Sequence, residues 1–129
     1  MASAGHRHLV VVLQGLADKI YKILGAGYSE RVYHNAFEVL LRKHGIQYES
    51  ERVIPIMFMG HAIGNVRADL VIEGEIIVEL KSIKNLNCST RTQIENYMKL
   101  TGLSQGLLVN FQGDSCEFEV CDTSGETAA

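Results

Sequence analysis

The stretch RADLVIEGEIIVELKS, residues 67–82, decides the fold because it has the pattern of two strands joined by a turn at Gly74. Alternate residues of a strand point to opposite faces, so each strand is expected to have one apolar and one charged face. The expected apolar faces are Val66, Ala68, Leu70 and Ile72 on the first strand and Ile76, Val78 and Leu80 on the second. The opposite faces are Arg67, Asp69 and Val71 on the first strand and Ile77, Glu79 and Lys81 on the second.

Matching the two apolar faces fixes the register of this hairpin. It sets Leu70 opposite Val78, which makes the carboxylates of Asp69 and Glu79 neighbours. A two-residue turn would shift the pairing by one residue and turn Glu79 away from Asp69. The sequence therefore predicts a loop of odd length, or a bulge, between the strands.

Two adjacent carboxylates repel each other unless a positive charge lies between them. A divalent cation meets that need, and carboxylate oxygens suit Mg²⁺ or Mn²⁺. Lys81 lies on the same face as Glu79, where it could position a water or offset charge on a phosphate. The alternative is a solvated salt-bridge face with little energetic consequence, and strand spacing alone leaves both open.

The rest of the chain predicts a mixed arrangement of helices and strands. Apolar residues recurring at three and four predict a helical hairpin, with Ser29 as N-cap of the second helix. The expected elements are helices at 8–24 and 30–44, strands within 46–82 numbering three or four, a helix at 88–102, strands at 105–111 and 116–121, and a frayed tail at 122–129. The fold class is therefore α/β, of the α+β kind.

Composition indicates one globular domain spanning residues 1–129, with 47% hydrophobic and 21% charged residues. No stretch reaches the ~20 apolar residues that span a bilayer, so no membrane partner is expected. A cytoplasmic location is predicted, or a nuclear one in a eukaryotic or viral setting, and not secretion. Three Cys without CxxC spacing argue against disulfides and structural zinc. The net charge of −3 means that any nucleic-acid contact must be local.

Three segments, 25–41, 45–83 and 93–111, together resemble the small bacterial and viral proteins of the GxxExxY family, within the PD-(D/E)XK nuclease superfamily. Gly27, Glu30 and Tyr33 match the family's name pattern. The triplets at 67–69 and 79–81 match its RAD and ELK segments. The resemblance implies a restriction-endonuclease-like core: a helix, three antiparallel strands, a helix and a closing strand.

The resemblance also implies roles for individual residues. Asp69 and Glu79 would hold the metal, with the main-chain carbonyl of Leu80 assisting. Lys81 would be the catalytic lysine, and Glu30 would complete the acidic site. The activity implied is Mg²⁺- or Mn²⁺-dependent hydrolysis of phosphodiester bonds in nucleic acid, with DNA favoured over RNA. Small superfamily members often dimerise to hold duplex DNA, so a homodimer is also allowed.

Further residues are candidates for contacts with the nucleic acid. Arg67, Lys84 and Arg91 would contact phosphates, and Gln93 would contact the backbone or metal-bound water. Tyr97 shares a helical face with Gln93 but is given no role at the site, and Tyr33 is expected to pack in the core. The five His residues have no ligand spacing, and surface or helix-end positions are expected for them.

Two alternatives to a nuclease stay open. The family commonly has a His three residues before the Gln, whereas this chain has Thr90. That difference suits a catalytically weak or inactive module on the same fold that binds nucleic acid or a protein partner. The apolar run from Val53 to Met59 suits a self-associating protein.

Overall fold

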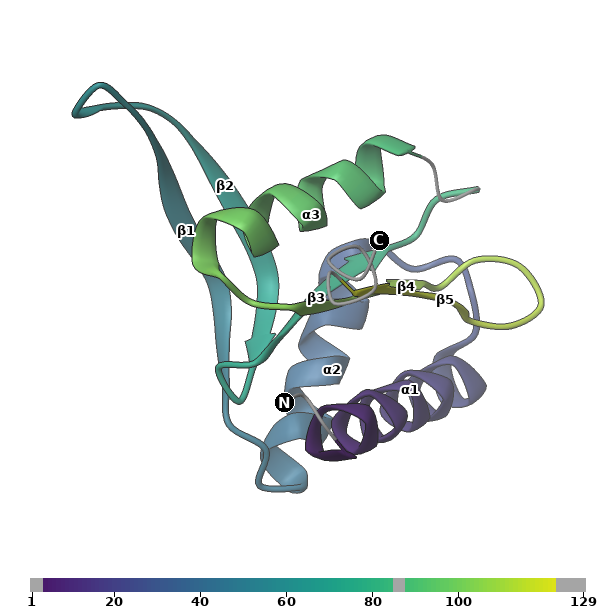
Figure 1. Cartoon of the computed structure of the whole chain (residues 1–129). Coiled ribbons are helices and arrows are strands. Elements are labelled where there is room, and N and C mark those ends of the chain that lie inside the picture. Colours follow the sequence, from purple (N-terminus) through teal and green to yellow (C-terminus); the bar gives the residue numbers. More distant parts are fainter. Residues whose placement is uncertain (1–3, 85–87, 123–129) are drawn as a thin grey trace.

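The computed structural model describes residues 4–84 and 88–122, which form three helices and five strands (Figure 1). In chain order these are α1 (Ala4–Leu24), α2 (Glu30–Lys43), β1 (Tyr48–Phe58), β2 (His61–Ile72), β3 (Ile76–Lys81), α3 (Cys88–Thr101), β4 (Gln105–Asn110) and β5 (Glu117–Asp122). The predicted order of elements is confirmed. Asp122 belongs to β5 and not to the expected tail, and the rest of that tail lies outside the described residues.

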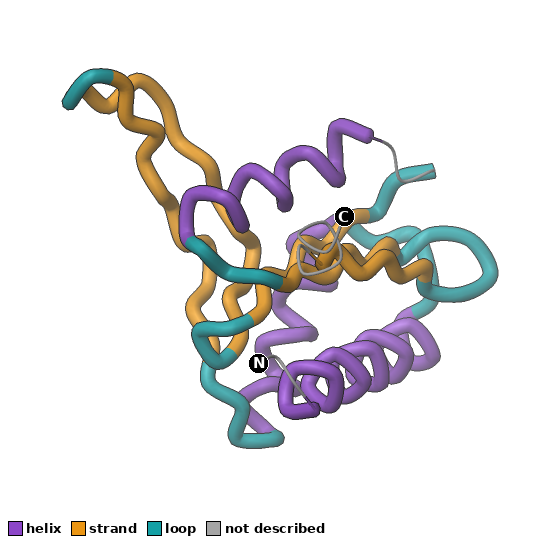
Figure 2. Tube along the Cα trace, in the orientation of Figure 1, coloured by secondary structure: helices purple, strands orange, loops and turns teal. Residues whose placement is uncertain are grey.

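The five strands form one sheet in the order β1-β2-β3-β4-β5. All neighbours are antiparallel except β3 and β4, which are parallel because α3 carries the chain back between them. Helices α1 and α2 cover one face of the sheet and α3 covers the other (Figures 1 and 2). This three-layer α+β arrangement is the restriction-endonuclease-like fold.

The β2–β3 hairpin has the predicted register, with Leu70 opposite Val78 and Ile72 opposite Ile76. Its loop has three residues, Glu73, Gly74 and Glu75, which confirms the predicted odd length. Glu73 and Gly74 have left-handed φ angles of 54° and 66°. The loop closes with a hydrogen bond of 2.9 Å from the Glu75 amide to the Ile72 carbonyl.

The predicted division into one apolar and one charged face is wrong. Both faces of the sheet are covered by helices, and Val71 and Ile77 are fully buried against α3. Along β2, Ala68 packs with the α3 layer, whereas Leu70, two residues later, packs with the α1–α2 layer. Regular alternation would keep both on the same face. The strand therefore changes faces at Asp69.

Strand β1 changes faces at the same level. Ser50, which pairs with Leu70, bonds to α2 through His34 at 2.9 Å. Arg52, which pairs with Ala68, lies near enough to Tyr97 of α3 for its charge to act on that phenol. Between Ser50 and Arg52 stands Glu51, whose φ of 56° is left-handed and breaks the pleat. Beyond this point the β1–β2 hairpin extends as an arm (Figure 2).

The GxxExxY segment forms the corner between α1 and α2. Gly27 has a φ of 107°, a conformation that favours glycine, and α2 begins three residues later at Glu30. The Tyr33 hydroxyl donates a 2.6 Å hydrogen bond to the Gly25 carbonyl. Its buried ring stacks on Phe111 with centroids 4.3 Å apart. The predicted core position of Tyr33 is confirmed, and this corner fixes where Glu30 stands.

Candidate active site

Asp69 and Glu79 meet where the β2–β3 ladder ends. The Asp69 amide donates a hydrogen bond of 3.0 Å to Oε1 of Glu79. In return the Leu80 amide donates one of 2.8 Å to Oδ2 of Asp69. Each carboxylate thus accepts a backbone hydrogen bond from the opposite strand, and both are buried, at 8% and 5% exposure. The prediction that the two carboxylates are neighbours is confirmed.

The electrostatics of this pair are unfavourable to two negative charges. Burial, and then the charge of Asp69, raise the pKa of Glu79 from 4.5 to about 7. The hydrogen bond from the Asp69 amide and the charge of Lys81 act in the opposite direction but are weaker. Near neutral pH the pair therefore takes up a proton readily or needs another positive charge.

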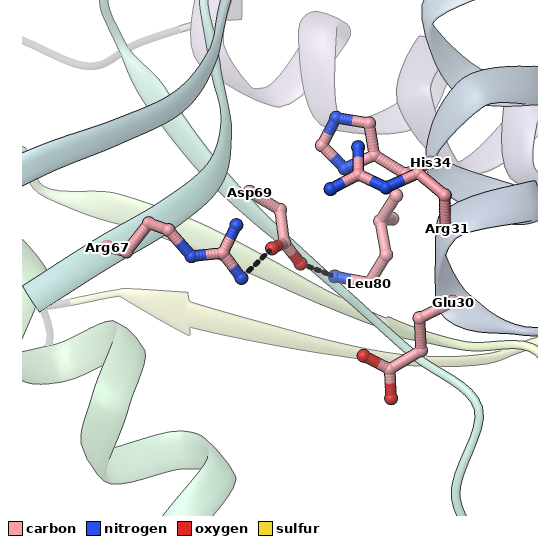
Figure 3. A pocket seen from close by; sticks show the side chains of 6 residues that line it. All are labelled: Glu30, Arg31, His34, Arg67, Asp69 and Leu80. Atoms are coloured by element: carbon pink, nitrogen blue, oxygen red, sulfur yellow. Dashed lines mark hydrogen bonds and ion pairs between the residues drawn. The ribbon is translucent and has the colours of Figure 1, made fainter.

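Asp69 lines a cavity of about 130 Å³ between β2 and the start of α2 (Figure 3). Oδ1 of Asp69 lies 3.2 Å from Nη2 of Arg67, and the side chain is thus held from both sides. The lining residues are Glu30, Arg31, His34, Arg67, Asp69 and Leu80. The cavity joins two carboxylates with two guanidinium groups, a composition suited to a phosphate and a cation together.

Glu79 and Lys81 line a second cavity, of about 230 Å³, on the side of α3. Gln93 and Asn96 of α3 and Asn65 of β2 complete its polar wall. Arg67 lines both cavities, so they adjoin along β2 and β3. The structure thereby places Gln93 in the same cavity as Lys81, whereas the Tyr97 side chain is buried in the core.

Glu30 reaches the site from the first turn of α2, a position that the helix dipole favours for a carboxylate. Its Oε2 accepts a hydrogen bond of 3.4 Å from the Ser82 amide, just beyond β3. Among the described residues, no three His, Cys, Asp or Glu side chains form a group that could hold a metal ion. Glu30 therefore borders the Asp69–Glu79 pair without forming a three-carboxylate cluster with it.

Two of the expected nucleic-acid contacts lie apart from these cavities. Lys84 is exposed beyond the end of β3 and lines neither cavity. Arg91 forms an ion pair with Glu119 of β5, on the far side of β3 and β4. Thr90, where the family commonly has His, is buried at 7% exposure.

Sequence analysis missed Arg31 and His34. His34 is 4% exposed, so the surface or helix-end position expected for it is wrong. Its Nε2 lies 2.9 Å from Oγ of Ser50 and 2.8 Å from Oε2 of Glu38. Because one ring nitrogen serves both partners, the three do not form a relay of the serine-hydrolase type. Helical spacing could have indicated both residues, because they follow Glu30 within about one turn of α2.

The donor set fits a hard divalent cation. Oxygen ligands from one or two carboxylates, completed by water and phosphate, are the usual environment of Mg²⁺. Burial and the charge of Asp69 raise the pKa of Glu79, and a bound cation would favour its charged form. Asp69 and Glu79 are thus the residues suited to hold such an ion.

Comparison with family models assigns the chain to a superfamily. Residues 7–120 match the model of the PD-(D/E)XK nuclease superfamily. The protein belongs to this superfamily, whose members are generally dependent on divalent metal ions.

Comparison with solved structures supports the fold. The structure titled "Crystal structure of SSO0001" has a TM-score of 0.57 and 23% sequence identity to this chain. The match covers 71% of this chain and 48% of the other, so this chain spans about half the length of that protein. At this identity the likeness concerns the fold alone. A comparison with curated protein sequences gave no match.

No helix in the described part of the chain is long and apolar enough to cross a membrane.

Proposed function

We propose that the protein is a metal-dependent nuclease that hydrolyses phosphodiester bonds in nucleic acid, with DNA as its preferred substrate. The observation that carries the proposal is the buried Asp69–Glu79 pair, linked by reciprocal backbone hydrogen bonds, with Lys81 two residues along the same strand. The match of Gly27, Glu30 and Tyr33 to the GxxExxY pattern supports placing the chain in that family.

The residues divide the chemistry between them. Asp69 and Glu79 would hold Mg²⁺ or Mn²⁺, with the Leu80 carbonyl and Glu30 as further oxygen donors. When bound, such an ion activates water and offsets charge on the phosphate. Lys81 positions the attacking water or stabilises the negative charge that develops on the phosphate oxygens. Gln93, in the cavity that Lys81 lines, orients the water or the nucleic-acid backbone.

Nucleic acid would be held by basic side chains around the site. Arg67 lines both cavities and is half exposed, so its guanidinium can turn toward a phosphate. Lys84 and Arg91, which lie farther away, would contact more distant phosphates of a longer substrate. A homodimer, which the family resemblance allows, would hold both strands of a duplex and can be checked by light scattering.

The test is cleavage of labelled single- and double-stranded DNA and RNA in Mg²⁺, in Mn²⁺ and in EDTA. Asp69→Asn and Lys81→Met should each abolish metal-dependent cleavage, whereas the charge-matched variants Glu49→Gln and Lys99→Met should cleave like the parent. Calorimetry with the metal alone should show binding that Asp69→Asn loses and Lys81→Met keeps. Cleavage that survives in Lys81→Met would refute the assignment of this lysine.

A second candidate is a binding module on the nuclease fold, and the β1–β2 arm favours it. The arm exposes Met57, Phe58 and Met59 by 56%, 60% and 82%, and Ile63 by 64%. Such side chains suit a protein partner better than a phosphate backbone. If the parent protein cleaves none of the four substrates in either metal, this second function takes the place of the first.

A further inference from the structure

Arg31 and Arg67 converge on one carboxylate at the mouth of the cavity beside Asp69. Nη2 of Arg31 lies 2.9 Å from Oε1 of Glu51, and Nη1 of Arg67 lies 3.3 Å from the same oxygen. The two arginines come from different elements, α2 and β2, and both line the cavity. A single oxygen atom thus accepts from two guanidinium groups, as a phosphate oxygen does in many phosphate sites.

The backbone of Glu51 is a second, independent indication. Its φ of 56° is left-handed, which is uncommon for a residue with a side chain, and it occurs opposite Asp69 where both strands change faces. Strained residues of this kind persist where the surrounding structure holds them, and they cluster at ligand sites. The carboxylate of this residue lies between Arg31 and Arg67.

We propose that Arg31 and Arg67 form a two-arginine site for a backbone phosphate of the nucleic acid, and that Glu51 occupies this site as an intramolecular stand-in until substrate displaces it. The inference rests on the proposed function, because it assigns the substrate of that same site. It adds Arg31 and Glu51 to the residues that govern binding.

The weak, exposed ion pairs of Glu51 explain why a substrate phosphate can displace it. The Arg31, Arg67 and Glu51 side chains are 54%, 50% and 42% exposed, so water and salt screen their pairing and the carboxylate is held weakly. A phosphodiester offers both arginines an oxygen each, and it brings neighbouring phosphates with it. Glu51 would therefore act as an electrostatic gate that lowers affinity for short or weakly charged ligands.

The experiment measures binding of a short fluorescein-labelled DNA duplex by anisotropy, in EDTA to prevent turnover. Glu51→Gln should bind about fivefold tighter than the parent, the scale expected when two exposed ion pairs are released. Glu49→Gln is the matched control, because it removes the same charge from an exposed position on the same strand and should leave affinity unchanged. In the Glu51→Gln background, Arg31→Ala should remove the gain.

Salt dependence adds a second measure of the same site. Arg31→Ala should lower the slope of log affinity against log salt concentration by about 1, because one phosphate contact is lost. Unchanged or weaker binding by Glu51→Gln overturns the inference while the nuclease assignment stands. An equal gain in Glu49→Gln also overturns it, since the effect would then be one of net charge.

A third measurement separates this inference from the proposed function. The Nε–Hε NMR signals of Arg31 and Arg67 are followed while inorganic phosphate is added to the Glu51→Gln and Glu49→Gln proteins. Both signals should move at a lower phosphate concentration in Glu51→Gln. If no variant binds DNA, the proposed substrate fails, and this titration still decides the two-arginine site: signals that do not move, or that move alike in the two proteins, refute it.

Discussion

Replacement of Glu79 by Gln should make the metal-free protein more stable. Glu79 is 5% exposed, and burial together with the charge of Asp69 raises its pKa from 4.5 to about 7. The folded state therefore binds a proton more tightly than the unfolded state between these two values. Stability is full below about pH 4.5 and falls as the pH rises to about 7, above which the loss is complete. Each pKa unit corresponds to 1.36 kcal/mol, so the loss is about 3 kcal/mol.

Glutamine keeps the Oε1 atom that accepts from the Asp69 amide and carries no charge. At pH 8 in EDTA, Glu79→Gln should thus exceed the parent in unfolding free energy by up to about 3 kcal/mol. For a chain of this size that is a rise in Tm on the order of 10 °C. The two proteins should converge near pH 4.5. Urea unfolding followed by circular dichroism over this pH range measures the difference, with the exposed-site variant Glu49→Gln as control.

Metal should narrow the difference in stability between the two proteins. Mg²⁺ at ten times its Kd should stabilise the parent by about 1.4 kcal/mol and leave Glu79→Gln unaffected, because that variant lacks a charged ligand. A variant that is less stable than the parent at pH 8 in EDTA, or that keeps the parent's pH profile, would refute the account of a buried and charge-crowded carboxylate.

The remaining predictions concern the site, the corner before α2 and the packing of α3. In the parent, metal affinity measured by calorimetry should fall as the pH is lowered from 8 to 6, because the Glu79 pKa of about 7 makes the ion compete with a proton; an affinity independent of pH would contradict this. Tyr33→Phe should lower the unfolding free energy measured in urea by about 1 kcal/mol, since the hydroxyl donates to the Gly25 carbonyl and accepts from the Tyr28 amide. The same change should reduce cleavage, because it loosens the segment that holds Glu30. Full cleavage activity would show that this segment does not affect the site. Gly106→Ala should lower the unfolding free energy by about 1–3 kcal/mol, because a Cβ there would lie 2.6 Å from Cδ1 of Ile94. Adding Ile94→Val to the same chain should recover part of this loss, as measured by thermal unfolding.

The order of elements and the register of the central hairpin could be predicted because both depend on local periodicity. The pairing of Leu70 with Val78 follows from the positions of apolar residues and from a loop that must be odd in length. The same reasoning placed Asp69 beside Glu79. The hairpin register and the pairing of the two carboxylates both depend on sixteen consecutive residues, 67–82, so no distant part of the chain is needed to infer them.

The change of faces at Asp69 could not be predicted from that stretch. Alternation assumes a regular pleat, and the irregularity originates on the neighbouring strand, at Glu51 with its left-handed backbone. The sequence ESERV around it contains no glycine or proline to mark such a conformation. Val71 and Ile77 were assigned to a charged face for a different reason: only the position of α3 shows that this face of the sheet is covered.

Long-range partners account for the other differences. Arg91 is a candidate for a phosphate contact because it is basic and follows the ELK strand, and the sequence does not show that it also pairs with Glu119 of β5. Arg31 was passed over because it is one of many charges on an amphipathic helix. Its ion pair with Glu51 of β1, at 2.9 Å, is known only from the structure. Sequence spacing gives the face of an element, and packing alone decides what that face meets.

Burying two carboxylates in the β2–β3 hairpin costs free energy in the metal-free protein, and hydrogen bonds from the backbone offset part of this cost. Asp69 and Glu79 stand where the backbone ladder stops, so each can take a hydrogen bond from an amide that would otherwise lack a partner. These two hydrogen bonds join the strands where the regular pleat is interrupted. A cavity lies on each side of this point, one toward α2 and one toward α3. Burial, and then the charge of Asp69, raise the Glu79 pKa. A cation between the carboxylates would offset both effects, so the same feature that weakens the metal-free fold favours binding of the ion. Stability and activity are therefore expected to move in opposite directions when Glu79 is neutralised.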